Sequence, residues 1–201
     1  MCGLPASGKT TTAGRLHRSL GGRLIRSGDV YADLGISLPE WVRRTRGFTE
    51  RVEEYARRRD TAYEEMARRL DAALVAGASP IIVDAVHGEP DKRAAVYAAC
   101  RARGAAPMVV WCRCDDPAET ERRVLARRGR ESEPEHEAAD LSVVRHLTAL
   151  WRDPTPDARA TPGVPILVYD TSASRLVDHL GPVSALVDRV AAALPAAGPE
   201  G

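Results

Sequence analysis

The sequence is poor in aromatic residues and in lysine, and it contains no long apolar run. Aromatic side chains make up 4% of its 201 residues, with a single phenylalanine. No stretch approaches the roughly 20 apolar residues of a membrane-spanning helix, and we expect neither a membrane span nor a secretory signal. The four cysteines lack the spacing of a disulfide framework. Together these features predict a cytoplasmic protein.

The charge is almost balanced, with 29 Lys and Arg against 28 Asp and Glu, for a net charge of +1. Nothing in the overall charge therefore favours a nucleic acid or an anionic membrane as a partner. The apolar content of 44% is ordinary for a globular protein. A chain of this length can bury a sizeable core, and we expect one domain over residues 1–194 with a disordered tail at 195–201.

Residues 3–10, Gly-Leu-Pro-Ala-Ser-Gly-Lys-Thr, match the pattern G-x-x-x-x-G-K-[ST] in full and are called the phosphate loop below. In this motif, glycines let backbone N–H groups turn toward phosphate oxygens, and the lysine reaches the β- and γ-phosphates. The hydroxyl of Thr10 can bind Mg²⁺. Lys9 and Lys92 are the only lysines among the 29 basic residues, so a chain that otherwise uses arginine has lysine at this position.

Short apolar segments alternate with segments of helical spacing along the chain. This alternation predicts an α/β fold in three layers, with a parallel sheet covered by helices on both faces. We expect strands at 23–26, 80–84, 107–114 and 166–169, helices at 10–20, 49–77, 90–103, 116–128, 140–151 and 182–194, and a loop at 154–165. Asp116, Pro117 and Glu119 form a strong helix start.

The strand that normally precedes a phosphate loop is short here, because only Met1 and Cys2 stand before Gly3. We therefore expect a truncated first strand. Either the start codon has been placed too far downstream or the chain lacks its central strand. The first alternative is favoured, because losing a buried strand removes several apolar side chains worth about 1.5–3 kcal/mol each.

Two carboxylates come at or after the ends of predicted strands. Asp29 follows the strand at 23–26, and Asp84 ends the next one. The carboxyl ends of parallel strands are where open α/β sheets bind ligands. The alternatives are that Asp29 caps the following segment and that Asp84 is a turn residue. His87, three residues after Asp84, is a candidate to line a substrate pocket.

Arginines supply a further group of candidates. Arg123 and Arg127 are four residues apart and share one face of a predicted helix, which leads into a polar segment. A fixed cation stabilises the charge on a phosphoryl group in transfer. Because arginine is abundant throughout this chain, a solvated helix face is the alternative for each of them.

In this order, the phosphate loop, Asp29, Asp84 and the arginine-rich helix resemble the small P-loop kinases of the zeta-toxin, polynucleotide-kinase and chloramphenicol-phosphotransferase group, often described as an AAA-type ATPase domain. The resemblance spans roughly residues 3–172 and implies a P-loop NTPase fold with a short helical lid at about 127–140. It implies ATP and Mg²⁺ as cofactors. Residues implied to bind the phosphates are Gly3, Ser7, Gly8, Lys9, Thr10 and Thr11.

The resemblance also implies individual roles. Lys9, Asp29 and Arg127 would be catalytic, with Asp29 receiving the acceptor hydroxyl as general base. Asp84 would hold Mg²⁺ through water or orient the acceptor, together with His87. Arg123 and Arg127 would close over the nucleotide, and the adenine would rest beside the turn at Thr171.

The implied activity is transfer of the γ-phosphate of ATP to a hydroxyl group of a small molecule. Polynucleotide kinases carry an arginine three residues after the acceptor aspartate, where this chain has Ala32. A polynucleotide 5′-hydroxyl kinase is therefore the less favoured alternative, and a nucleotide-binding regulatory module with little turnover is another. The sequence leaves open the identity of the acceptor, GTP as donor and the oligomeric state.

Overall fold

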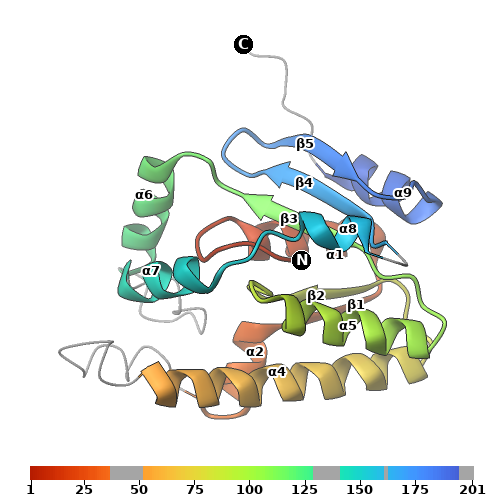
Figure 1. The fold of residues 1–201 in the computed structure, drawn as a ribbon, viewed down its shortest axis with the longest axis horizontal. Coiled ribbons are helices and arrows are strands. Elements are labelled where there is room, and N and C mark those ends of the chain that lie inside the picture. Colours follow the sequence, from red (N-terminus) through yellow and green to blue (C-terminus); the bar gives the residue numbers. More distant parts are fainter. Residues whose placement is uncertain (37–51, 129–140, 161–162, 195–201) are drawn as a thin grey trace.

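The computed structural model describes residues 1–36, 52–128, 141–160 and 163–194 (Figure 1). In chain order, its elements are α1 (Lys9–Leu20), β1 (Arg23–Arg26), α2 (Ser27–Asp33), α4 (Val52–Val75), β2 (Ile81–Asp84), α5 (Pro90–Ala102), β3 (Val109–Arg113), α6 (Pro117–Arg128), α7 (Leu141–Leu150), α8 (Thr155–Arg159), β4 (Ile166–Asp170), β5 (Arg175–Leu180) and α9 (Ala185–Ala193). Among the described helices, none has both the length and the apolar character needed to cross a bilayer.

The strands form two hydrogen-bonded groups. β1 pairs with β2 in parallel, and β3 pairs with β4 in parallel, while β5 adds to β4 as an antiparallel edge. Parallel pairing brings the carboxyl ends of β1 and β2 to one edge, and those of β3 and β4 likewise. The predicted α/β class with a parallel sheet and helical layers is confirmed.

The first residues of the chain join the two groups of strands. The Cys2 N–H donates to the Val110 carbonyl at 2.9 Å, and the Cys112 N–H donates to the Cys2 carbonyl at 2.9 Å. On the opposite side, the Met1 ammonium donates to the Val83 carbonyl at 2.9 Å. The N-terminal segment is thus a very short strand between β2 and β3 (Figure 1), and it is the truncated first strand that the sequence predicts.

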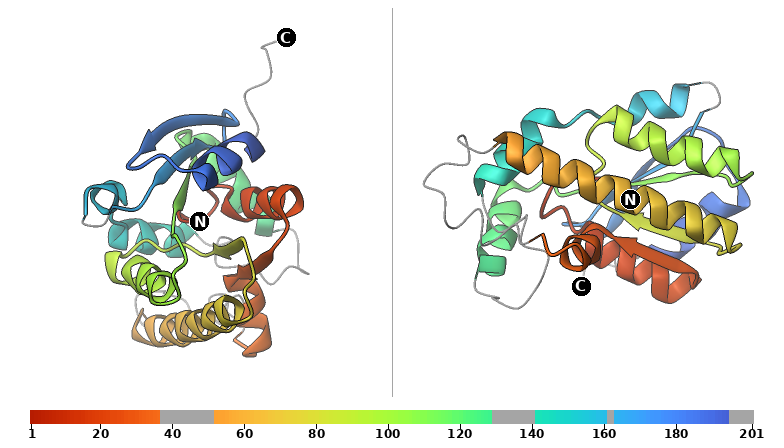
Figure 2. Two further views of the ribbon diagram at one scale, coloured as in Figure 1. Left: turned by 90° about the vertical axis from the view of Figure 1, so that its right-hand side faces the viewer. Right: turned by 90° about the horizontal axis from the view of Figure 1, so that it is seen from below.

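Helices cover both faces of the strands because side chains alternate between the faces. Ile25 and Val83 point into a core cluster that includes α4 residues, whereas Ile82 and Leu24 pack in the cluster formed with α1 and α9. Figure 2 shows α4 and α5 on one side of the strands and α1 on the other. Two apolar layers enclosing parallel strands account for the near-continuous apolar runs of β2, β3 and β4.

The start of α6 follows the predicted capping pattern. Asp116 Oδ1 accepts from the backbone N–H groups of Ala118 and Glu119 at 2.9 and 3.3 Å. Pro117 occupies the first helical position, where its missing N–H costs nothing. The α6 helix therefore has the geometry that its sequence encodes locally.

Three local expectations were wrong or incomplete. The segment at 154–165 contains the short helix α8 instead of being entirely loop, and β5 was not predicted. Helix α2, which carries Asp29 in its first turn, was not among the expected helices. Residues 129–140 of the predicted lid and the tail at 195–201 lie outside the described residues.

Candidate functional site

The backbone of the phosphate loop adopts conformations that its glycines permit. Gly3, Ala6 and Gly8 have φ values of 146°, 63° and 78°. A Cβ at Gly3 would lie 2.3 Å from the Cys112 carbonyl oxygen, and one at Gly8 would lie 2.9 Å from the Thr171 side chain. Both motif glycines are therefore required by backbone conformation and by close packing.

Lys9 and the first turn of α1 complete the cradle. Lys9 is only 8% exposed, and its Nζ donates to the Leu4 carbonyl at 2.8 Å, across the loop. α1 begins at Lys9, so its N-terminal N–H groups and the positive end of its dipole lie at the loop. Thr10 is half-buried and Thr11 is exposed. A buried ammonium and a helix N-terminus together make a site for phosphate.

Ser7 adds a buried hydroxyl to this cradle. Within the described residues its Oγ is buried without a hydrogen-bond partner. Buried polar atoms are normally satisfied by protein or water. An unsatisfied hydroxyl in a loop of this shape therefore fits a bound polar group such as a phosphate oxygen.

The two predicted carboxylates lie at the same edge of the β1–β2 pair. Asp84 ends β2 in register with Arg26, the last residue of β1. Asp84 is 3% exposed, and in the described part of the chain its Oδ1 is buried without a hydrogen-bond partner. The Asp29 side chain is 53% exposed, with its Oδ1 4.0 Å from an Arg26 guanidinium nitrogen. One carboxylate is thus buried and suited to a cation or its water, and the other is open to a substrate.

His87 lies in the interior against the N-terminal segment. Its Nδ1 is 3.0 Å from the Met1 carbonyl oxygen, and its backbone N–H donates to the Tyr63 hydroxyl at 3.0 Å. Burial lowers the pKa of His87 to about 3, and the Met1 ammonium acts in the same direction. The neutral ring therefore donates from Nδ1 to the carbonyl. His87 supports residue 1, and its predicted contact with an acceptor stays a prediction.

Arg123 and Thr171 brace the outer side of the phosphate loop. Arg123 donates to the Ala6 carbonyl at 3.2 Å and to the Thr171 hydroxyl at 2.9 Å, while its Nε donates to Glu119 at 2.7 Å. The Thr171 hydroxyl donates to the Ser7 carbonyl at 2.9 Å. These two residues hold carbonyl groups of the loop, and their direct contact with a nucleotide stays a prediction.

Arg127 follows Arg123 by one turn of α6, but its side chain lies outside those that the structure describes. Its role therefore stays a prediction. Among the described residues, no group of three or more His, Cys, Asp or Glu side chains is placed to hold a metal. Mg²⁺ commonly binds through one or two carboxylates together with substrate phosphates, and Asp84 with Thr10 fits that type of site.

One buried arginine that the sequence did not single out organises the segment after β2. Arg93 is 2% exposed and donates to the carbonyls of His87, Gly88 and Arg152 at 3.1, 3.3 and 3.1 Å. Its Nε donates to Asp157 Oδ2 at 2.6 Å. No local pattern distinguishes Arg93 from the many other arginines, because its partners are distant in sequence.

Comparison with known proteins places the chain among P-loop proteins. A family model described as AAA domain matches residues 1–154. A gluconokinase from Sinorhizobium meliloti 1021 superposes with a TM-score of 0.53 at 16% identity, covering 96% of this chain and 87% of that one. Kti12 from Chaetomium thermophilum, in complex with ADP-AlF3, superposes with a TM-score of 0.56 at 20% identity, covering 86% and 88%.

No curated protein sequence gives a significant match. At these identities the two solved structures show the fold alone, which is that of a P-loop kinase-like protein. The family model covers more than half of the chain, including the phosphate loop, Asp29, Asp84 and α6. This chain belongs to the AAA domain family.

Proposed function

We propose that this protein is a Mg²⁺-dependent phosphotransferase that moves the γ-phosphate of ATP to a hydroxyl group of a small molecule. The observation that carries the proposal is the phosphate loop. There, the buried side chain of Lys9, the first residue of α1, donates across the loop to the Leu4 carbonyl. The buried and unpartnered Oδ1 of Asp84 supports it, within the described residues. One of the similar structures is, by its name, a kinase.

The proposal gives each of these residues a role. Lys9 and the loop N–H groups bind the β- and γ-phosphates, and Thr10 with Asp84 would hold Mg²⁺. When bound, the metal neutralises negative charge on the phosphates. Arg127, one turn beyond Arg123, supplies a cation to the transferred group. Asp29 is the most exposed of the carboxylates at this edge and meets the acceptor.

The chemistry balances without a further reactant. The acceptor oxygen forms a bond to the γ-phosphorus while the bond from that phosphorus to the β–γ bridging oxygen breaks, and ADP leaves with the electron pair. The hydroxyl proton goes to the Asp29 carboxylate. Because the transition state of such transfers is loose, orienting the hydroxyl contributes more than removing its proton.

A small acceptor is favoured over a polynucleotide by the sequence. The net charge of +1 gives no electrostatic preference for nucleic acid. Ala32, next to the last residue of α2, stands where polynucleotide kinases carry an arginine, and its methyl group has no charge with which to bind a phosphate. The cytoplasmic location remains part of this proposal.

The first test follows labelled γ-phosphate from ATP to a panel of metabolites, nucleosides, antibiotics and 5′-hydroxyl oligonucleotides. Lys9→Ala is expected to reduce transfer at least about 100-fold with an unchanged circular dichroism spectrum. Lys92→Ala is the matched control, because Lys92, in the first turn of α5, pairs with Asp60 of α4 at 2.8 Å. Transfer by Lys9→Ala at the wild-type rate would contradict the proposal.

A second pair of variants tests the acceptor side. Asp29→Asn is expected to lower the transfer rate far more than the affinity for ATP. Asp33→Asn, on the same helix, loses only an ion pair with Arg69 at 2.8 Å and is expected to keep both. Equal losses of transfer rate and ATP affinity in Asp29→Asn would contradict the assignment of Asp29 to the acceptor site. ATP binding by the wild type without any transfer would indicate a regulatory module. Transfer of the label to the oligonucleotides would indicate a 5′-hydroxyl kinase.

A further inference from the structure

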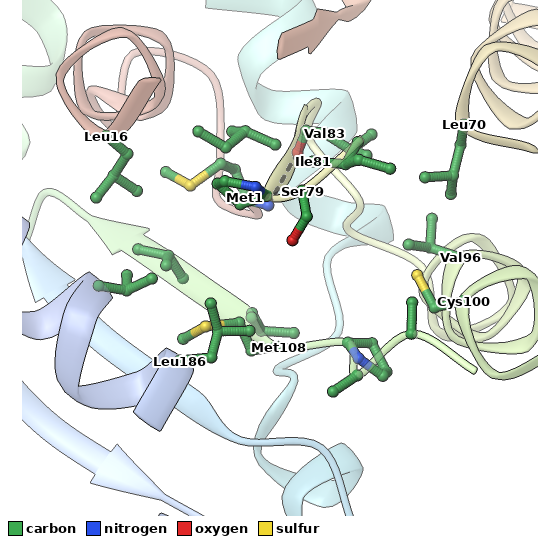
Figure 3. Close-up of a pocket in the computed structure, with 18 of the residues that line it drawn as sticks. Met1, Leu16, Leu70, Ser79, Ile81, Val83, Val96, Cys100, Met108 and Leu186 are labelled. Atoms are coloured by element: carbon green, nitrogen blue, oxygen red, sulfur yellow. Dashed lines mark hydrogen bonds between the residues drawn. The ribbon is translucent and has the colours of Figure 1, made fainter. Parts of the chain in front are cut away.

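An apolar cavity of about 400 Å³ separates β2 from β3 behind the first residues of the chain (Figure 3). Met1 lies at one end of it. Leu16 of α1 and Leu186 of α9 line one side, and Leu70 of α4 and Val96 of α5 line the other. Both helical layers thus present apolar side chains to a space that lies in the plane of the strands.

The cavity is one strand wide. At its end, a single backbone segment bonds on both sides, with Met1 reaching the Val83 carbonyl of β2 and Cys2 reaching the Val110 carbonyl of β3. Neighbouring strands lie about 4.8 Å apart, so β2 and β3 are separated at this level by the width of one strand. The cavity continues this gap toward the N-terminal ends of both strands, as far as Ser79 before β2 and Pro107 before β3.

The walls of the cavity also carry backbone groups that suit a strand. Along a β-strand, the N–H and C=O of one residue point to the same side, and successive residues alternate. The Val83 and Val110 carbonyls accept from the N-terminal segment, so their N–H groups point to the cavity side as well. The Val109 N–H donates to the Pro165 carbonyl, on the β4 side, as this alternation requires.

We propose that the cavity is a strand slot, which takes an extended apolar segment that leads directly into the nitrogen of Met1 and runs parallel to β2 and β3. The Met1 nitrogen already occupies the place of a strand N–H, since it donates to the Val83 carbonyl. The carbonyl of the residue directly before Met1 would accept from Val110, and that of the second residue before it from Val83.

The walls define the chemistry of this segment. With apolar helices on both sides, every side chain of the segment is buried, so residues such as Val, Ile and Leu are favoured at each position. A length of about five residues matches the depth of the slot and the usual length of a strand. A compact apolar molecule would fill the volume but leave the N–H groups of Val83 and Val110 without partners, which is costly inside a protein.

The proposal is tested by extending the chain. One variant carries Val-Ile-Val-Ile-Val directly before Met1, after a new initiator methionine, and the matched control carries Val-Pro-Val-Pro-Val. Proline supplies no N–H and disrupts a central strand, whereas the length and apolar character are retained. Amide hydrogen exchange is followed by NMR at Val83 and Val110 in the original chain and in both extended chains.

The Val-Ile extension is expected to slow exchange at Val83 and Val110 by about 100-fold or more and to raise Tm by on the order of 10 °C. The proline extension is expected to leave both unchanged. Equal exchange rates in the two extended chains would overturn the proposal, as would full protection of both amides in the original chain. A gain in Tm with both extensions, without a change in exchange, would indicate apolar filling and also overturn it. None of these measurements uses nucleotide, so they stand independently of the proposed phosphotransferase activity.

Discussion

Replacing Arg93 by methionine tests whether one buried ion pair fixes the segment that follows β2. Arg93 is 2% exposed, and it joins four carbonyl groups to the Asp157 carboxylate. Methionine has a similar length and no charge, so Arg93→Met removes the donors without leaving a large cavity. The carboxylate then loses its cation but keeps the Tyr97 hydroxyl, which donates to it at 2.8 Å.

The size of the effect follows from what is left unpaired. Removing one partner of a buried ion pair costs about 3–5 kcal/mol, because the other charge stays buried. Asp157 is 16% exposed and retains one hydrogen bond, so we expect the lower end, about 3 kcal/mol. For a chain of this size, each kcal/mol lowers Tm by roughly 2–4 °C. Arg93→Met is therefore expected to lower Tm by about 6–12 °C.

Thermal and urea unfolding give the measurement, with Arg103→Met as the matched control. Arg103 also pairs with an aspartate, Asp71, at 2.9 Å, but both side chains are about half exposed. Exposed pairs contribute about 0–1 kcal/mol, so the control is expected to lose little. The double variant Arg93→Met/Asp157→Asn should recover part of the loss, because the stranded charge is gone. Equal losses for Arg93→Met and Arg103→Met would refute the reasoning.

Three further predictions concern the site. Folding holds the pKa of His87 at about 3, so below about pH 6.5 the unfolded chain binds one more proton than the folded chain. The free energy of unfolding of the wild type therefore falls by up to about 1.4 kcal/mol for each pH unit of acidification. His87→Asn should flatten this dependence, which urea unfolding between pH 4 and 7 measures. Gly8→Ala should weaken ADP binding about tenfold or more by calorimetry, because a Cβ there lies 2.9 Å from a neighbouring side chain; Gly21→Ala, also at positive φ but in open space, should leave ADP binding unchanged. Arg123→Met should lower both Tm and ADP affinity, because it releases the phosphate loop. Arg122→Met loses only an exposed pair with Glu119 and should change neither. Equal effects of the two variants would show that Arg123 does not support the loop.

The parts of the fold that could be predicted are those that local sequence determines. The two motif glycines and Lys9 specify a loop that leads into a helix, and Asp116 with Pro117 specifies the start of α6. Apolar runs such as Ile81–Asp84 indicate strands buried on both faces. In each case the residues that decide the structure are neighbours in the chain, so their spacing carries the information.

β5 could not be predicted because it does not carry such a pattern. It is an antiparallel edge strand in which Leu176 and Val177 remain 41% and 46% exposed. Its own residues do not alternate between buried and exposed, because the first four are exposed and the last two are half-buried. The strand exists because β4 offers a free edge. α8, with five residues, is too short to show helical periodicity.

The candidate residues could be chosen from the sequence by their type, but the contacts that hold them could not. The guanidinium of Arg123 meets carbonyl groups of the loop and of Thr171, contacts that the sequence did not predict. The ring of His87 likewise meets the Met1 carbonyl, 86 residues away in sequence. Such contacts depend on where distant segments come together, which spacing along the chain does not encode.

The same long-range contacts explain how a phosphate loop can be held at the end of so short a strand. Cys2 is fixed by hydrogen bonds to β3, and Gly3, the first residue of the loop, donates to the Val86 carbonyl at 3.1 Å. The far side of the loop is held by Arg123 and Thr171. Because both ends of the loop are anchored to separate elements, its shape depends on those contacts more than on the length of the strand that leads into it.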